Sequence, residues 1–310
     1  MVTFRQALIN SYNTVAVRVV AKVGSEKGVA MAKKLGITSL VEEGTLNDVN
    51  LSAGLGGLTK GVSVEEMAGA YGVFANQGYY NKPHTIVKIL NQQGKVVYTA
   101  DNKPKQVISP ETAYMITSCL TDVVNRGTGV LARIYDGRVT AGKTGTTDNA
   151  KDLWFVGYTP QYVGCVWIGF DQPAQIYSTS DATSRIFGAI MSYLHQGLPY
   201  EDFVRPDNVV SVLIDTKTGN LASRSTPGIY RSMELFKSGT EPSTYSSGGY
   251  DASSDNTWAS NSYNTDTSSA QDTTGNVDYS NNNNTTETTT TDNSSEDNSS
   301  NDALSGLPAA

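Results

Sequence analysis

The sequence predicts an α+β fold in which an antiparallel sheet is flanked by helices. Helical spacing of apolar residues recurs within the first 76 positions, and three strand-like segments then lie close together between residues 139 and 170. A further helical segment follows them. Helices, then clustered strands, then another helix are typical of the α+β class.

The helices are predicted from apolar spacing together with their start and stop signals. Ser and Asn residues break the pattern at residues 10–13, because they favour caps and turns. Ser63 and Glu66 have the spacing of a capping box, and Pro110 suits a first helical position after Ser109. The predicted helices are residues 3–9, 13–23, 25–35, 63–76, 109–125 and 183–195.

The strands are predicted from short apolar runs that end in turn residues. The central cluster is residues 139–146, 153–158 and 162–170. Two more strands are expected on either side of a Gln-Gly turn in HTIVKILNQQGKVVYT. A last hairpin is expected in VVSVLIDTKTGNLAS, around the turn at residues 217–219.

Charge and composition divide the chain at residue 243. Residues 243–310 carry ten acids and no Lys or Arg, and they are rich in Ser, Thr, Asn and Asp. Such a segment has too little apolar surface to fold, so it is predicted to be a disordered tail. Residues 1–242 carry a net charge of +3 without a basic stripe, which argues against nucleic-acid binding.

Histidine and metal chemistry are not expected. His84 and His195 are the only histidines, and both are predicted at the surface. A His-based serine triad or a His-rich metal site is therefore improbable on composition, and no cofactor is predicted.

One segment, GRVTAGKTGTTDNAK, has two interpretations. Residues 137–144 fit the G-x-x-x-x-G-K-[ST] loop of nucleotide hydrolases. A phosphate-binding loop must open a helix directly, whereas Gly145 and the Thr/Asp/Asn run after it favour a strand end and a turn. The P-loop NTPase is therefore kept as a minor alternative. The same residues contain Lys143-Thr144-Gly145, a K-T-G motif.

The chain resembles the transpeptidase domain of class A penicillin-binding proteins over about residues 2–242. Ser11 and Asn13 in VTFRQALINSYNTVAVRVV match the S-x-N motif of that family, and Lys143 opens the K-T-G motif 132 residues later. EEMAGAYGVFANQGYYNKPHTIVKI, RGTGVLAR and GTEP resemble further family segments. The resemblance implies a penicillin-binding, β-lactamase-like fold whose domain is residues 1–242, with a C-terminal hairpin, followed by the tail at 243–310.

The resemblance also implies the chemistry and the role of each matched residue. The family forms a Ser acyl-enzyme with stem peptides ending in D-Ala-D-Ala and transfers the acyl group to an amine; β-lactams occupy the same site. Lys143, Thr144 and Thr146 would hold the terminal carboxylate, and Gly145 would admit the substrate backbone. A backbone N–H near Thr146 would serve the oxyanion hole. Two further roles would fall to Ser11, as proton relay, and to Asn13, as a partner of the substrate amide.

The family's nucleophile motif, S-x-x-K, is not found in this sequence. No Ser is followed by Lys three positions later. We therefore expect the chain to be a C-terminal piece, with a fold incomplete at its N-terminus and no activity alone. The resemblance places the parent at the outer face of the cytoplasmic membrane or in the cell wall, with its membrane anchor in the preceding part.

Simpler structural interpretations stand beside these roles. Ser11 could be only a helix cap, Lys143 a guard on a strand edge, and Gly145 a bulge. Trp154 is expected in the core and Asp152 in a turn. A non-catalytic wall-binding remnant is the alternative function from a different class.

Overall fold

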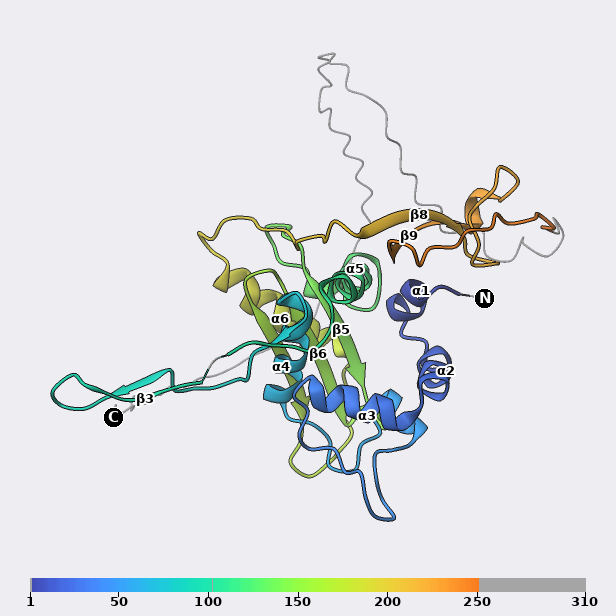
Figure 1. Cartoon of the computed structure of the whole chain (residues 1–310). Coiled ribbons are helices and arrows are strands. Elements are labelled where there is room, and N and C mark those ends of the chain that lie inside the picture. The colour runs from blue at the N-terminus through green and yellow to red at the C-terminus, as the bar shows by residue number, and fades with distance from the viewer. Residues whose placement is uncertain (1, 102, 251–310) are drawn as a thin grey trace, which may run out of the picture. The chain divides into compact units, whose positions relative to one another are not determined.

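The computed structural model describes residues 2–101 and 103–250 (Figure 1). Most of the predicted acidic tail, residues 251–310, lies outside the described part of the chain. No helix in the described part is long and apolar enough to cross a membrane. The α-helices there are α1 Phe4–Ile9, α2 Asn13–Val23, α3 Ser25–Lys34, α4 Val64–Ala75, α5 Pro110–Arg126 and α6 Ser180–Leu194, and the 3-10 turns are η1 Leu51–Leu55, η2 Val130–Ala132, η3 Asp148–Ala150 and η4 Gly228–Tyr230.

The strands form four antiparallel sheets within the described residues. The central sheet has the order β5-β6-β7, and the pairs β1 with β4, β2 with β3, and β8 with β9 are separate. The predicted α+β class is confirmed. The strands are β1 Tyr79–Tyr80, β2 Lys88–Leu90, β3 Val96–Thr99, β4 Lys105–Gln106, β5 Ala141–Thr146, β6 Asp152–Tyr158, β7 Val163–Gly169, β8 Val209–Asp215 and β9 Arg231–Lys237.

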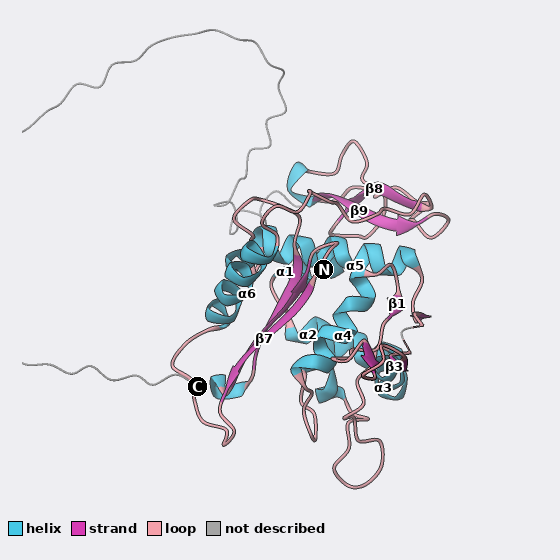
Figure 2. Cartoon of the chain, turned by 90° about the vertical axis from the view of Figure 1, so that its left-hand side faces the viewer, coloured by secondary structure: helices cyan, strands magenta, loops and turns pink. Residues whose placement is uncertain are grey.

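The central sheet lies between two layers of helices. Side chains alternate along β6, so Phe155 faces α6 and Tyr158 faces α4 and α5. Phe155 packs on Phe187 of α6, with 4.7 Å between the ring centroids. Tyr158 packs on Tyr71 of α4 and shares a hydrogen bond of 2.9 Å with Thr117 of α5. Figure 2 shows α6 and α4 on opposite sides of the strands, so each face of the sheet has its own core.

The start of α4 fixes the loop that precedes it. The predicted capping box is confirmed: the Ser63 hydroxyl accepts from the Glu66 backbone, and the Glu66 carboxylate accepts from the Ser63 backbone. The same carboxylate accepts from the backbone N–H and the hydroxyl of Thr38, both at 2.7 Å. Burial alone would raise the pKa of Glu66, but these hydrogen bonds outweigh it and lower the pKa to about 2. Residues 37–40 are thereby held against α4.

The C-terminal hairpin differs from its prediction. The turn at residues 216–219 is present, but β8 pairs mainly with β9, and only one bridge joins Ile214 to Leu221. The sequence signal for the tight turn was local, whereas the long pairing crosses a loop that has no simple turn pattern. Residues 244–250 continue along the hairpin, where the Ser246 N–H donates to the Leu221 carbonyl at 2.8 Å.

His195 is buried, so the predicted surface position is wrong. Its Nδ1 lies 2.7 Å from the Met191 carbonyl oxygen, which requires Nδ1–H as donor. Its Nε2 lies 2.9 Å from the hydroxyl of Thr159, and Tyr162 packs on the ring. With both ring nitrogens hydrogen-bonded, His195 can be buried as an ordinary core residue.

Candidate active site

Ser11 lies in a strained turn between two helices. α1 ends at Ile9, and Ser11 has a φ of 54°, which is unusual for a residue other than glycine. The N-cap of α2 is Tyr12, so the interpretation of Ser11 as a helix cap is wrong. The Ser11 hydroxyl instead lies beside β5. Strain of this kind persists only where surrounding contacts hold it, and it is frequent at active sites.

The K-T-G residues lie in β5, at the edge of the central sheet. Lys143 pairs with Val156 and Gly145 with Trp154 in a regular antiparallel register. The chain continues as a strand to Thr146, and a short 3-10 turn follows, so no helix opens after the Gly-Lys-Thr sequence. This arrangement excludes the P-loop NTPase interpretation, because a phosphate loop needs a helix N-terminus there.

Lys143 and Ser11 form the centre of the site. The Lys143 ammonium donates to the Ser11 hydroxyl oxygen at 2.8 Å and to the Thr144 carbonyl at 3.0 Å. Desolvation by burial lowers the pKa of Lys143 to about 8. Because the ammonium donates to the Ser11 oxygen, the Ser11 hydroxyl hydrogen remains available for another acceptor. The pair can therefore hold a positive charge and pass a proton through one hydroxyl.

Gly145 packs closely against the neighbouring strand and does not form a bulge. A Cβ atom on Gly145 would lie 3.2 Å from the Cβ of Trp154 on the neighbouring strand. The pairing through Gly145 shows no register shift, so the bulge interpretation is wrong. The opposite edge of β5 has no strand neighbour among the described residues, which leaves it able to pair with an extended ligand.

Thr128 is a site residue that sequence reasoning missed. Its hydroxyl lies 2.7 Å from the Thr144 hydroxyl, and its N–H donates to the Ile9 carbonyl at 3.3 Å. The neighbouring Gly127 fits tightly, since a Cβ there would lie 2.6 Å from the Ile9 oxygen. Thr128 therefore connects the end of α1 to the K-T-G strand. In the sequence, only the resemblance of RGTGVLAR to a family segment indicates this region.

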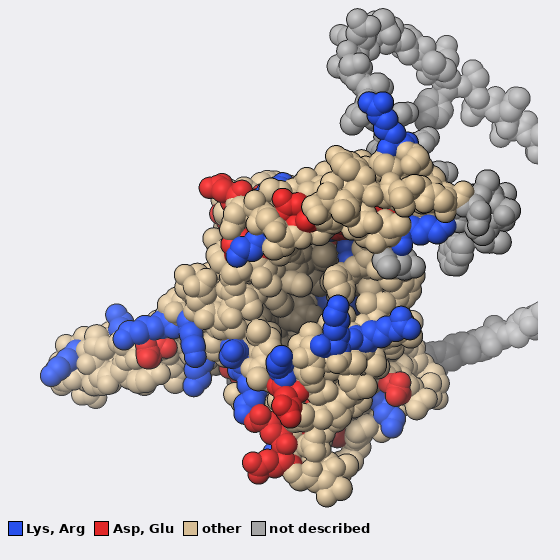
Figure 3. Space-filling view, turned by 45° about the vertical axis from the view of Figure 1, so that its right-hand side comes forward, with Lys and Arg blue, Asp and Glu red and all other residues tan. Residues whose placement is uncertain are grey.

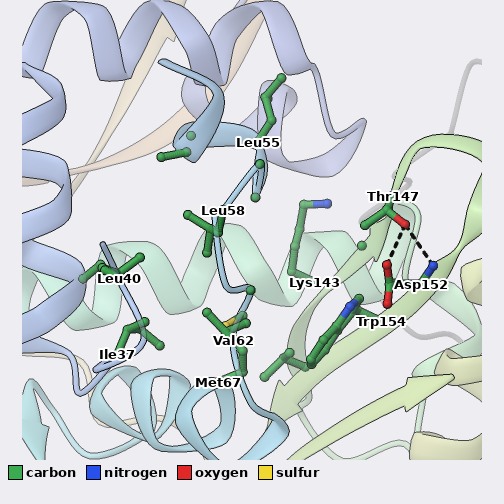
Figure 4. A pocket seen from close by; sticks show the side chains of 18 of the residues that line it. Ile37, Leu40, Leu55, Leu58, Val62, Met67, Lys143, Thr147, Asp152 and Trp154 are labelled. Atoms are coloured by element: carbon green, nitrogen blue, oxygen red, sulfur yellow. Dashed lines mark hydrogen bonds between the residues drawn. The ribbon is translucent and has the colours of Figure 1, made fainter. Parts of the chain in front are cut away.

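A cleft of about 970 Å³ opens beside Lys143. β5 forms one wall, and residues 37–67 form the other (Figure 4). The second wall is mainly apolar but also carries Asn50, Lys60 and Ser63, and further polar groups lie on the first wall, a mixture that is usual for ligand sites. The apolar side chains of this wall that Figure 4 labels are Ile37, Leu40, Leu55, Leu58, Val62 and Met67.

Asp152 closes the far end of β5. Its carboxylate accepts from the Thr147 hydroxyl at 3.0 Å and from the Trp167 indole N–H at 3.0 Å. The Thr147 hydroxyl in turn accepts from the Asp152 N–H, which fixes the turn between β5 and β6 (Figure 4). Trp154 is only half-buried and lines the cleft, so its predicted place in the core is wrong.

The structure brings some of the predicted site residues together. Ser11 and Lys143 are in contact, and Thr144, Gly145 and Thr146 line the same cleft as Lys143. Asn13 is the first residue of α2 and is exposed, two positions after Ser11.

Two regions of the chain match known protein families. The penicillin binding protein transpeptidase domain matches residues 1–192, and the C-terminal domain of penicillin-binding protein 1A matches residues 205–248. The chain is 36% identical to penicillin-binding protein 1A of Clostridium botulinum over 250 residues, which cover 79% of this chain and 30% of that protein. It is 36% identical to penicillin-binding protein 1A/1B of Bacillus subtilis, with 79% of this chain and 28% of that protein covered.

Solved structures show the same fold. Penicillin-binding protein 1A from Haemophilus influenzae superposes with a TM-score of 0.66 at 23% identity, covering 79% of this chain and 41% of that one. PonA1 from Mycobacterium tuberculosis gives a TM-score of 0.57 at 30% identity, covering 66% of this chain and 59% of that one. The chain spans less than a third of both bacterial relatives described above. With the transpeptidase match over residues 1–192, the chain belongs to the penicillin-binding protein transpeptidase family.

Proposed function

We propose that this chain supplies the carboxylate-binding and proton-relay half of a serine D,D-transpeptidase that cross-links peptidoglycan stem peptides. The proposal rests on the contact between Lys143 Nζ and Ser11 Oγ, which lies beside the open edge of β5. A cation beside that edge suits a peptide that ends in a carboxylate. The parent protein would act at the outer face of the cytoplasmic membrane or in the cell wall.

The reaction requires a charge and a proton route that these residues can supply. A serine hydroxyl gives its proton to a base as its oxygen bonds to the carbonyl carbon of the penultimate D-Ala. The bond to the terminal D-Ala nitrogen then breaks as that nitrogen gains a proton, and D-Ala leaves. The path from Lys143 through Ser11 can deliver this proton, and transfer of the acyl group to an amine then restores the serine. Asn13 would bind the substrate amide, and Thr146 the terminal carboxylate.

Thr144 has a narrower proposed role. Its hydroxyl is shared with Thr128, so one of its hydrogen-bonding positions is occupied before substrate binds. It can still bind a carboxylate by rotating or by donating its hydrogen while accepting from Thr128. Gly145 would admit the substrate backbone along the open edge of β5.

The nucleophile must come from outside the motifs present here. No S-x-x-K occurs in the sequence, so we expect the chain alone to bind substrate-like peptides without forming an acyl-enzyme. The domain would be residues 1–242, extended along its C-terminal hairpin by residues 244–250, and the acidic segment after them would take no part in the chemistry. A non-catalytic wall-binding protein is the second candidate, and the same missing motif favours it.

Saturation-transfer NMR with an N-acetylated peptide ending in D-Ala-D-Ala tests the proposal. We expect weak, reversible binding by the 310-residue chain, reduced by about 2–3 kcal/mol in Lys143→Ala, since a charge-assisted bond is lost. Lys34→Ala, an exposed lysine on α3, is the matched control. Equal binding by Lys143→Ala and the unaltered chain would remove Lys143 from the site.

A labelled β-lactam distinguishes the two candidate functions. The chain alone should retain no label through denaturing electrophoresis under either function. If a serine-bearing N-terminal segment of the family is then added in trans, label incorporation would support the transpeptidase half. Reversible binding without incorporation would support the wall-binding protein.

A further inference from the structure

Residues 82–105, of which 102 is not described, form an arm built on β2 and β3. We call this segment the ribbon. Every residue from 84 to 99 is exposed, so no side chain in this run is buried against the rest of the domain. Figure 1 shows the ribbon extending away from the central sheet. An isolated two-stranded hairpin is only marginally stable in water, so such an arm calls for an explanation.

Both faces of the ribbon carry apolar side chains. Ile89 lies opposite Tyr98. The register shifts by one residue after this pair, so Leu90, on the other face of β2, lies opposite Val96. Alternation adds Val87 to the first face. Their exposed fractions run from 43% to 67%. The apolar residues of the ribbon exposed to this degree are Ile86, Val87, Ile89, Leu90, Val96, Val97 and Tyr98. Apolar surface gathered in this way marks an interaction site.

Positive charge surrounds this apolar surface. The ribbon has a single acid, Asp101, and five lysines, all of them exposed. Figure 3 shows blue Lys side chains spread along the arm. The lysines are Lys82, Lys88, Lys95, Lys103 and Lys105. An apolar centre with a charged rim is the usual anatomy of a protein interface, and this rim requires negative charge opposite.

The charge and the shape together select one kind of partner. A second copy of this chain would set the lysines of two ribbons against each other, which is repulsive. A membrane surface would cover one face of the ribbon and leave the apolar side chains of the other face in water. A protein can cover both faces or add a strand to a free edge of β2 or β3.

We propose that the ribbon is a docking arm for a protein that presents apolar side chains within an acidic surface. The partner's carboxylates face the lysines of the ribbon, and its apolar side chains cover Val87, Ile89 and Tyr98. This inference is independent of the chemistry at Lys143, because none of the described residues of the ribbon lines the cleft.

A binding titration of the 310-residue chain with synthetic polymers tests the chemistry of the partner. The probes are a copolymer of Glu and Tyr, polyglutamate, a copolymer of Lys and Tyr, and vesicles of phosphatidylglycerol. Three variants are compared: Lys88→Gln with Lys95→Gln, Val87→Ser with Ile89→Ser and Tyr98→Ser, and the control Lys27→Gln with Lys34→Gln on α3. Circular dichroism and the thermal midpoint establish that each variant is folded.

The Glu and Tyr copolymer should bind the unaltered chain and the control equally. Both ribbon variants should bind it about tenfold more weakly. Raising the salt from about 50 mM to about 300 mM should also weaken the binding of the unaltered chain and of the control. Equal binding by the control and both ribbon variants would overturn the proposal. So would a preference for the Lys and Tyr copolymer, for plain polyglutamate, or for the vesicles through the same residues.

Discussion

The ammonium nitrogen of Lys143 lies 2.8 Å from the hydroxyl oxygen of Ser11, across 132 residues of sequence. This contact joins the turn after α1 to the edge strand of the sheet. The site therefore forms only when the fold brings the turn after α1 against β5. The lowered pKa of Lys143, about 8, is a property of this closed arrangement.

We predict that Lys143 titrates near pH 8 and that its titration makes the free energy of unfolding depend on pH. Burial lowers its folded pKa below the ordinary value of about 10.4, so the unfolded chain binds more protons between these two values. The free energy of unfolding should therefore rise as the pH increases from about 8 to about 10.4. Carbon-13 NMR of methylated lysines reports the pKa, and urea titrations report the stability.

Two variants separate this effect from general lysine titration. Lys143→Met should remove the rise in the unfolding free energy, while Lys34→Met should keep it. Ser11→Ala should lower the pKa of Lys143 further, because the ammonium loses one acceptor. A Lys143 pKa near the ordinary value in the folded chain would contradict the desolvated geometry.

Thr128 should stabilise the fold through the hydrogen bond of its hydroxyl group. Thr128→Val keeps the shape of the side chain but removes the hydrogen bond to Thr144, so we expect a loss of about 1 kcal/mol in the free energy of unfolding. Thr128→Ser should restore most of it. Urea titration of the three chains makes the measurement, and equal stability of the Val and Ser variants would show that the hydroxyl contact is unimportant.

Local chemistry in the sequence was enough to predict several parts of the structure. The spacing of Ser63 and Glu66 predicted the start of α4, and Pro110 after Ser109 predicted the start of α5. Glycine after Lys143-Thr144 predicted a strand in place of a helix. In each case the deciding interaction joins residues within one turn or one strand, so it is visible without the fold.

The remaining features depend on distant partners. β9 was missed because its pairing with β8 crosses a loop of 15 residues, from 216 to 230. The burial of His195 depends on the hydroxyl of Thr159, which lies on a different element. Thr128 reaches the site because the Ile9 carbonyl anchors its loop. None of these partners is marked by spacing in the sequence.

Arg5 should be essential for joining α1 to the C-terminal hairpin. Its guanidinium donates to Glu234 on β9 at 2.8 Å and to Asp122 on α5 at 2.9 Å, and both Arg5 and Glu234 are buried. Arg5→Met leaves a buried carboxylate unpaired, so we expect the free energy of unfolding to fall by about 3–5 kcal/mol. Denaturant titration measures this loss.

Arg126 provides the matched control for Arg5. It also binds Asp122 at 2.9 Å, but its side chain is exposed. Arg126→Met should therefore change the unfolding free energy by no more than about 0.5 kcal/mol. Similar losses of unfolding free energy in the two variants would mean that burial does not make the Arg5 ion pairs more stabilising than an exposed pair.

The position at which the C-terminal segment is cut should decide its effect on stability. Residues 251–310 have few apolar side chains in their sequence, so deleting them should leave the thermal midpoint nearly unchanged. A deletion from residue 243 also removes Ser246 and Tyr250. The Tyr250 hydroxyl donates to the buried Asp215, and burial alone would raise the pKa of Asp215, but hydrogen bonds lower it to about 2.

Loss of those donors leaves Asp215 under-satisfied, so the longer deletion should lower the unfolding free energy by about 1–3 kcal/mol. The folded pKa of Asp215 lies below its unfolded value of about 3.9, so its stabilising contribution is present above that pH and is lost as the pH falls toward 2. Differential scanning calorimetry of both deletions measures the difference. Equal midpoints would show that residues 243–250 contribute nothing to the hairpin.

The outer edge of β7 should make the chain prone to aggregation. β7 ends the central sheet, and no other strand pairs with its outer edge within the described residues. Val163 and Trp167 on this strand are 38% and 36% exposed. An unpaired apolar edge is a template for strand addition, and a lysine on such an edge opposes it. Val163→Lys should therefore reduce light scattering and hydrophobic-dye binding during storage, without lowering the thermal midpoint.

Tyr135→Lys, which replaces an exposed side chain away from any strand, should leave both signals unchanged. If the unaltered chain stays monodisperse and binds no dye, or if Tyr135→Lys works as well as Val163→Lys, the β7 edge is not the source of association.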